Sequence, residues 1–446
     1  MPGLTEHQLS VLRTVFGAAS NPIIADLEQA LAGEAIRGGP IAAVHELLSK
    51  EAVARRVRAA VFEPILPMCR PSPIGAVQFP AGAPILLWAA LSEAAPEQAH
   101  AAEAASLRAT DDEARPDPVY DELCLIAAQN LRHESPSFAP VIALLDKAQS
   151  GGAENFASYL DLAPITREAL GRLREWVGRM SDERAAAARL AYKDAVALSD
   201  DAGPRFFETL LAHLPEPWTI LRVVSAVMTH PGDRYVAVSE LAKFGEYILA
   251  DIDKRLNEFK AFDPTGGAEA GRAAGEALHL ASQEIGEFET SIELARDGPW
   301  GSRIAAQRRQ MAQSAEVRLG QIDKALDAAL PLKTVRFGKG FKGLPKLAAD
   351  PDLAAVRKAE GLMAFFDACH SCAGQSGYGA ARAKAAEKIV DRLDHYVEDL
   401  LETLRAEEIE GGAERVHAYL EIAAQFMEAA RDEKAGQIVR RRAAAA

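Results

Sequence analysis

Cysteine and aromatic residues are scarce in this sequence. Four cysteines in 446 residues are too few for a disulfide framework, and a reducing compartment fits this composition best. Aromatic residues make up 6% of the chain, and much of the apolar content is alanine, which favours helices that approach one another closely. The composition therefore predicts thin, extended helical layers instead of one thick core.

Long apolar runs are also missing. The most apolar stretch, Ala83 to Leu91, is about half as long as the roughly 18 residues that a membrane-spanning helix needs, and prolines flank it. The first residues, MPGLTEHQLSVL, lack the basic segment and apolar core of a signal peptide. We therefore expect a cytoplasmic protein without a transmembrane helix.

Positive charge is in deficit, because 50 lysines and arginines stand against 64 acidic residues and the formal net charge is −14. A surface of this sign repels nucleic acid over most of its area. General nucleic-acid binding is therefore not expected, although a local basic patch can still act against this background.

Familiar catalytic motifs are absent from the sequence: there is no GxSxG, no HExxH, no GxGxxG after a strand and no DxDxDG loop. This absence favours a non-catalytic protein without a cofactor. An enzyme that assembles its site from distant residues stays possible, because one sequence does not reveal such a site.

The clearest pattern in the sequence is apolar residues at helical spacing. Between residues 274 and 295 two apolar rows repeat every seven residues: Leu278, Ile285 and Ile292 in one, and Ala274, Ala281, Phe288 and Ala295 in the other. Such a seam must be buried against another helix. No convincing period-two strand is visible. The sequence thus predicts an all-α, multi-helical fold with an antiparallel, coiled-coil-like bundle towards the C-terminus.

Three regions are expected along the chain. Residues 1–150 form an irregular helical domain, with a Pro-rich apolar loop at 64–96 and a flexible segment at 100–118. Residues 151–263 form a middle helical region, and residues 264–446 form the long-helix bundle.

A basic, glycine-rich segment at 333–346 departs from the acidic character of the chain. Glycines space its basic residues, and it contains no acidic residue. Backbone amides and lysines can hold phosphate or anionic lipid, and aromatic rings can insert at an interface. The alternative is a solvated loop between helices. The candidate anion- or partner-binding residues are Lys333, Arg336, Phe337, Lys339, Phe341, Lys342 and Lys346.

Cys369-His370-Ser371-Cys372 has the CxxC spacing of zinc and redox sites. A structural zinc needs two further ligands, and His395 with its neighbour Asp394 are the nearest candidates in the sequence. Two Glu-x-x-His pairs could also contribute to a metal site. Small buried cysteines at a helix end are the more economical interpretation, so Cys369, Cys372 and His395 stay weak metal candidates.

The function that these observations favour is a non-catalytic intracellular scaffold or adaptor that binds other proteins, or itself, through helical seams. The first alternative is a peripheral membrane or anionic-ligand binding protein that uses the basic segment. The second is a helical metal-dependent protein.

Overall fold

A computed structural model describes residues 5–32, 40–71, 77–108, 116–337, 340–406 and 412–446. The fold is all-α and multi-helical, as the sequence predicted, apart from one small two-stranded sheet. The chain forms two compact units, residues 1–229 and 230–446. The boundary at Thr229–His230 coincides with neither of the two boundaries expected from the sequence, near 150 and 263.

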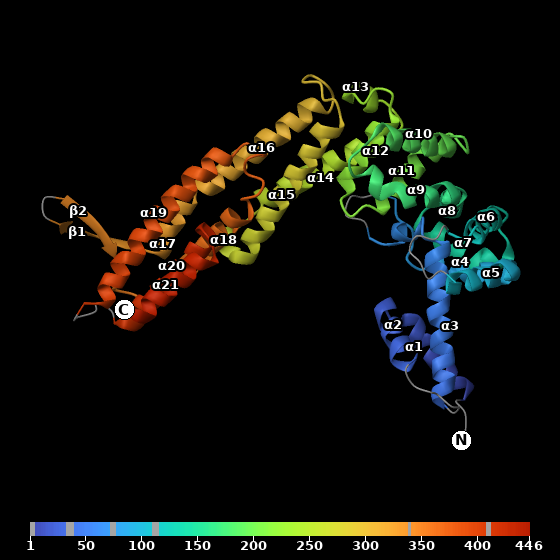
Figure 1. Ribbon diagram of the computed structural model, residues 1–446, viewed down its shortest axis with the longest axis horizontal. Helices are drawn as coiled ribbons and strands as arrows, with labels where there is room; N and C mark the ends of the chain where they lie inside the picture. Colours follow the sequence, from blue (N-terminus) through green and yellow to red (C-terminus); the bar gives the residue numbers. More distant parts are fainter. Residues whose placement is uncertain (1–4, 33–39, 72–76, 109–115, 338–339, 407–411) are drawn as a thin grey trace. The chain divides into compact units, whose positions relative to one another are not determined.

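Helices make up the first unit (Figure 1): α1 (Glu6–Ala18), α2 (Asn21–Ala32), α3 (Pro40–Val61), η1 (Leu66–Cys69), α4 (Ala83–Ala94), α5 (Pro96–Arg108), α6 (Val119–Arg132), η2 (Pro136–Phe138), α7 (Ala139–Ala148), α8 (Gly152–Asp161), α9 (Ala163–Trp176), α10 (Asp182–Val196), α11 (Ala202–Ala212), η3 (Pro217–Thr219) and α12 (Ile220–Val227).

The long helix α3 connects two separate cores of this unit. A small cluster formed by Phe16, Ile24 and Leu48 joins α1 and α2 to the first half of α3. The second half of α3 contributes Val57 and Val61 to a much larger core shared with α4 to α8. Figure 1 shows α1 and α2 lying beside one end of α3.

Two stretches of this unit differ from the sequence expectation. The Pro-rich stretch 64–96 contains the short helix η1 and the helix α4, with Trp88 inside the large core. Residues 100–108, expected within a flexible segment, complete helix α5. Alanines at 99, 102 and 105 are buried, so small side chains suffice to pack this helix. Residues 109–115 lie outside the described residues.

The second unit consists of longer helices and one hairpin: α13 (Asp233–Val236), α14 (Ala242–Lys260), η4 (Pro264–Gly266), α15 (Ala268–Ser291), α16 (Gly301–Gly320), α17 (Ile322–Ala329), β1 (Leu332–Phe337), β2 (Gly340–Pro345), α18 (Leu353–Ala368), α19 (Gly379–Leu404), α20 (Ala413–Ala430) and α21 (Glu433–Ala445).

Helix α15 is the central element of this unit and packs against α14 and α18. The heptad positions Leu278, Ile285 and Phe288 are all fully buried. Because η4 makes a short connection, α14 and α15 fold back on each other, and Arg255 of α14 reaches Glu284 of α15. Helix α15 ends at Ser291, so the last heptad lies beyond it. Coiled-coil packing stays a prediction.

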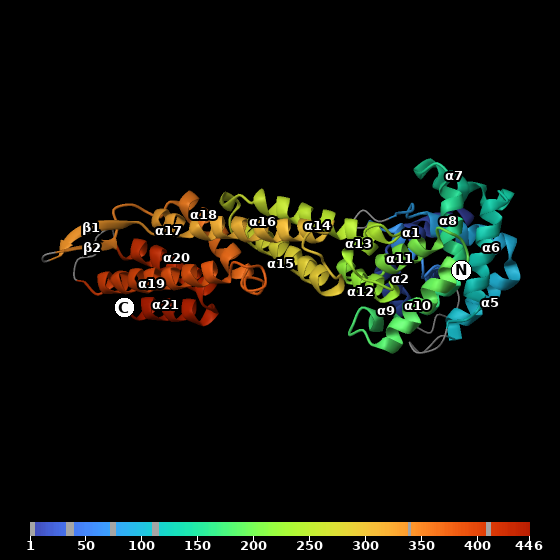
Figure 2. The ribbon, with the colours of Figure 1, turned by 90° about the horizontal axis from the view of Figure 1, so that it is seen from above.

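The basic segment forms two strands, although its sequence shows no convincing period-two pattern. Strands β1 and β2 pair antiparallel, with Leu332 opposite Pro345 and Val335 opposite Lys342. Two glycines and a proline in β2 interrupt the alternation of apolar and polar residues that marks a strand. The views in Figures 1 and 2 both show this hairpin extending past the neighbouring helices of its unit.

Candidate functional site

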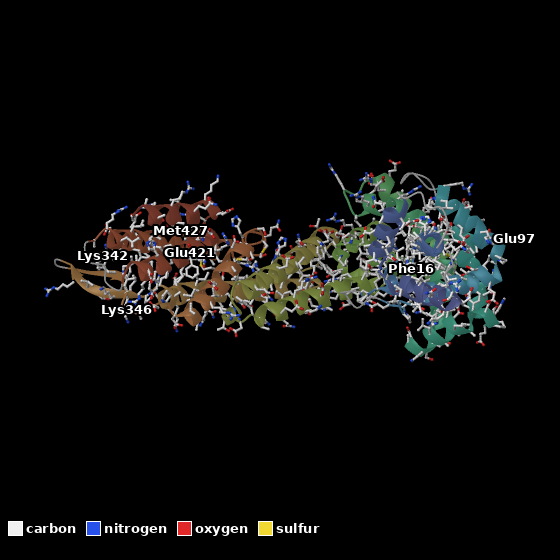
Figure 3. The ribbon with its side chains drawn as sticks, turned by 90° about the horizontal axis from the view of Figure 1, so that it is seen from below. Phe16, Glu97, Lys342, Lys346, Glu421 and Met427 are labelled. Carbon is white, nitrogen blue, oxygen red and sulfur yellow. The ribbon has the colours of Figure 1, made fainter. Side chains whose placement is uncertain are left out.

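The β1–β2 hairpin is held to its own unit by a lysine that the sequence suggested for ligand binding. Lys342 Nζ lies 2.7 Å from the Asp399 carboxylate on α19, and this hydrogen-bonded pair raises the pKa of Lys342. Lys342 is therefore already paired within its own unit. Figure 3 shows it beside the helices, with Lys346 at the same end of the unit.

Cross-strand pairing places the residues of the hairpin on two faces. Opposite residues in an antiparallel ladder share a face, so Lys342 lies on the same face as Val335. Side chains alternate along a strand, so Leu332, Thr334 and Arg336 lie on the other face. These three side chains are exposed, and Leu332 retains 46% of its accessible surface.

Of the seven candidate residues, Arg336 and Lys346 remain as exposed cations whose side chains have no partner in the described part of the chain. Lys333 is half-buried and makes an interaction. Lys339 lies outside the described residues, as do the side chains of Phe337 and Phe341. The hairpin thus presents a mixed apolar and cationic face.

The CxxC segment lies in a buried environment. Cys369 and Cys372 retain 0% and 2% of their accessible surface, and all four cysteines are free thiols. The Cys372 sulfur lies 3.0 Å from the Tyr378 hydroxyl. Burial raises the pKa of the Cys369 thiol to about 12, which disfavours the thiolate that metal binding and redox chemistry require.

The histidine candidates do not complete a metal site with these cysteines. The His395 side chain is 76% exposed and pairs with Asp391 of its own helix. His279 of α15 lies 3.3 Å from the Ser371 hydroxyl, which brings one Glu-x-x-His pair beside the CxxC segment. Within the described ranges, no three His, Cys, Asp or Glu side chains gather in a way that could hold a metal ion.

A buried cluster of charges joins α14 to α15. Arg255 lies 2.7 Å from the carboxylate of Glu284 and 2.7 Å from that of Asp251. Glu284 retains 1% of its accessible surface. Burial raises the pKa of Glu284 to about 8; the Asp251 charge adds to this shift and Arg255 opposes it. The cluster therefore links α14 to α15 in the interior of the unit.

This cluster predicts a pH-dependent stability. Because Glu284 ionises near pH 4.5 when exposed and near pH 8 when folded, the folded unit binds one proton more between these values. The free energy of unfolding should therefore fall as the pH rises from about 4.5 to about 8. Since one pKa unit corresponds to about 1.4 kcal/mol, we expect a decline of more than about 1.4 kcal/mol. Denaturant titrations monitored by hydrogen exchange in α15 would measure it.

Glu284→Gln supplies the control, because the amide resembles the protonated acid in shape and hydrogen bonding. This variant should match the wild type near pH 5 and be the more stable of the two at pH 9. If the free energy of unfolding changed with pH in the same way in both proteins, Glu284 would not be the group that causes the pH dependence.

No helix in the described part of the chain has the length and apolar character needed to cross a membrane. Comparison of the sequence and structure with protein-family models, curated proteins and solved structures found no match.

Proposed function

We propose that this protein is a non-catalytic cytoplasmic scaffold that binds a partner protein through the exposed face of the β1–β2 hairpin. The observation that carries the proposal is the position of this hairpin. It extends beyond the helices of its unit, and Lys342 fastens it to α19. The exposed face contains Leu332, Thr334 and Arg336.

The form of the hairpin favours a protein partner with an extended, acidic segment. Among the residues that the structure describes, each strand pairs with a strand on one side only, so the other backbone edge of each could accept a further strand. Addition of a strand to such an edge is a common mode of peptide recognition. The exposed cations Arg336 and Lys346 favour acidic side chains in that segment.

Charge reversal at the hairpin tests this proposal. We expect Arg336→Glu/Lys346→Glu to weaken binding of the partner about tenfold or more, because two attractions become repulsions. The measurement is affinity purification from native lysate, followed by titration of the recovered partner against purified wild type and variant. The Lys342–Asp399 pair is unchanged in the variant.

Lys384→Glu/Lys434→Glu is the matched control, because it changes the net charge equally at exposed lysines outside the hairpin. Lys384 lies 15 residues before Asp399 on the same helix, about 22 Å along its axis. Equal weakening by both variants would contradict a specific role for the hairpin. Loss of phosphatidylserine vesicle binding from the hairpin variant alone, without a protein partner, would favour a membrane surface instead.

A further inference from the structure

A cleft of about 560 Å³ opens in the second unit, beside the end of α15, the first half of α16 and the segment before α19. Its base is apolar: Ile292 and Ile304 are almost fully buried there, and Ala305 and Ala312 line its side. This volume lies within the range of small-molecule sites, about 300–1,000 Å³.

Three arginines surround this apolar base, which is unusual in a chain with a net charge of −14. Arg308 is already engaged, 2.9 Å from the Glu289 carboxylate and 3.2 Å from the Gln375 carbonyl. Arg296 and Arg309 are exposed and have no carboxylate partner among the residues described.

The charges of the lining leave an excess of one positive charge. Arg308 and Glu289 neutralise each other, and Glu293 is the other acid of the lining. Arg296 and Arg309 together outweigh it. The N-terminus of α16 adds little, because the Gly301 amide already donates to the buried Asp233 carboxylate at 3.2 Å. The two arginines are therefore the main attraction for an anion.

Trp300 anchors the segment that borders the cleft: it does not line the cleft itself but directly precedes the lining residue Gly301, and its ring lies edge-on to Phe288 of α15 with 5.4 Å between the centroids. Trp300 is buried and donates from Nε1 to Glu246 at 2.8 Å, and its ring packs against the backbone of Gly245. A segment that is already ordered loses little conformational entropy when a ligand binds.

We propose that this cleft binds a small organic anion, with its head group on Arg296 and Arg309 and its apolar body over Ile292 and Ile304. Guanidinium groups match carboxylate and phosphate oxygens in geometry as well as in charge. This ligand site is separate from the hairpin surface, and its test is independent of the proposed scaffold function.

Titration calorimetry with four probes tests the chemistry of the site: decanoate, decyl phosphate, decyltrimethylammonium and acetate, each below the concentration at which it forms micelles. One or both decyl anions should bind at least about tenfold more tightly than the decyl cation, and acetate should bind weakly because it lacks the apolar body. The tighter anion identifies the head group as carboxylate or phosphate. Equal affinity for decyl anions and cation, or no binding of either anion, would overturn the proposal.

Variants locate the binding in the cleft. Because each guanidinium supplies charge-assisted hydrogen bonds to the head group, Arg296→Ala/Arg309→Ala should lower the affinity for the decyl anion at least about tenfold. Ala305→Phe, at an exposed helix position, should also lower it by filling the cleft. Lys434→Ala/Arg441→Ala on α21 removes the same charge elsewhere and should leave the affinity unchanged. Unchanged affinity in the Arg296/Arg309 variant would place the bound anion outside this cleft.

Discussion

Gly271→Val is expected to lower the free energy of unfolding of the 230–446 unit by more than about 3 kcal/mol. A Cβ atom at position 271 would lie 2.0 Å from the carbonyl oxygen of Gly361 and 2.9 Å from the amide nitrogen of Phe365. Both are backbone atoms of α18, so relief of the clash requires the two helices to move apart. Overpacking typically costs about 1–3 kcal/mol, and a clash with helix backbone belongs at or above that range.

Hydrogen exchange followed by mass spectrometry in α15 and α18 would measure this loss, because it reports on one unit at a time. Gly286→Ala is the control on the same helix, since nothing lies within 4 Å of a Cβ atom there. It should stabilise the unit by about 0.5–1 kcal/mol, because alanine loses less entropy than glycine in a helix. A loss in the control as large as that in Gly271→Val would argue against close packing at Gly271.

The periodicity of the sequence revealed which residues of α15 are buried, but not the closeness of the α15–α18 contact. Leu278 and Ile285 are large apolar residues at regular spacing, so a pattern of hydrophobicity detects them. Gly271 and Gly275 are buried because the absence of a side chain lets α18 approach their backbone closely. A pattern of hydrophobic residues does not detect such positions. Their spacing of four residues was the available signal for a close helix contact.

The candidate surfaces were predicted in part. Composition identified the basic segment, yet the sequence could not distinguish Lys342, paired with Asp399 57 residues later, from the exposed Arg336. The arginines of the cleft come from a loop and a helix, and tertiary packing alone brings Arg296 and Arg309 to the same cleft. Adjacent arginines at 308 and 309, in a chain poor in positive charge, were the visible indication.

Arg167 illustrates the same limit in the first unit and predicts the other large effect. Its side chain is 3% exposed, and the sequence gives no sign that this arginine of α9 differs from its neighbours. The guanidinium lies 2.8 Å from the Asp121 carboxylate and donates to the carbonyls of Ala60 and Val61 at 2.6 and 2.7 Å. It therefore caps the end of α3 and links it to α6 and α9.

We expect Arg167→Met to lower the free energy of unfolding of the 1–229 unit by about 3–5 kcal/mol. The change removes the shared partner of the Asp121 and Glu63 carboxylates and the donor to the Ala60 carbonyl, and it leaves the Val61 carbonyl with the weak Cys124 thiol donor alone. Arg172→Met on the same helix is the control, since Arg172 is 54% exposed and pairs with Glu168 at 3.5 Å. Such a surface pair contributes at most about 1 kcal/mol. Hydrogen exchange in α3 and α9 would compare the two variants. Losses of equal size would mean that the buried guanidinium contributes no more than a solvated one, and the link between α3, α6 and α9 would then depend on apolar packing alone.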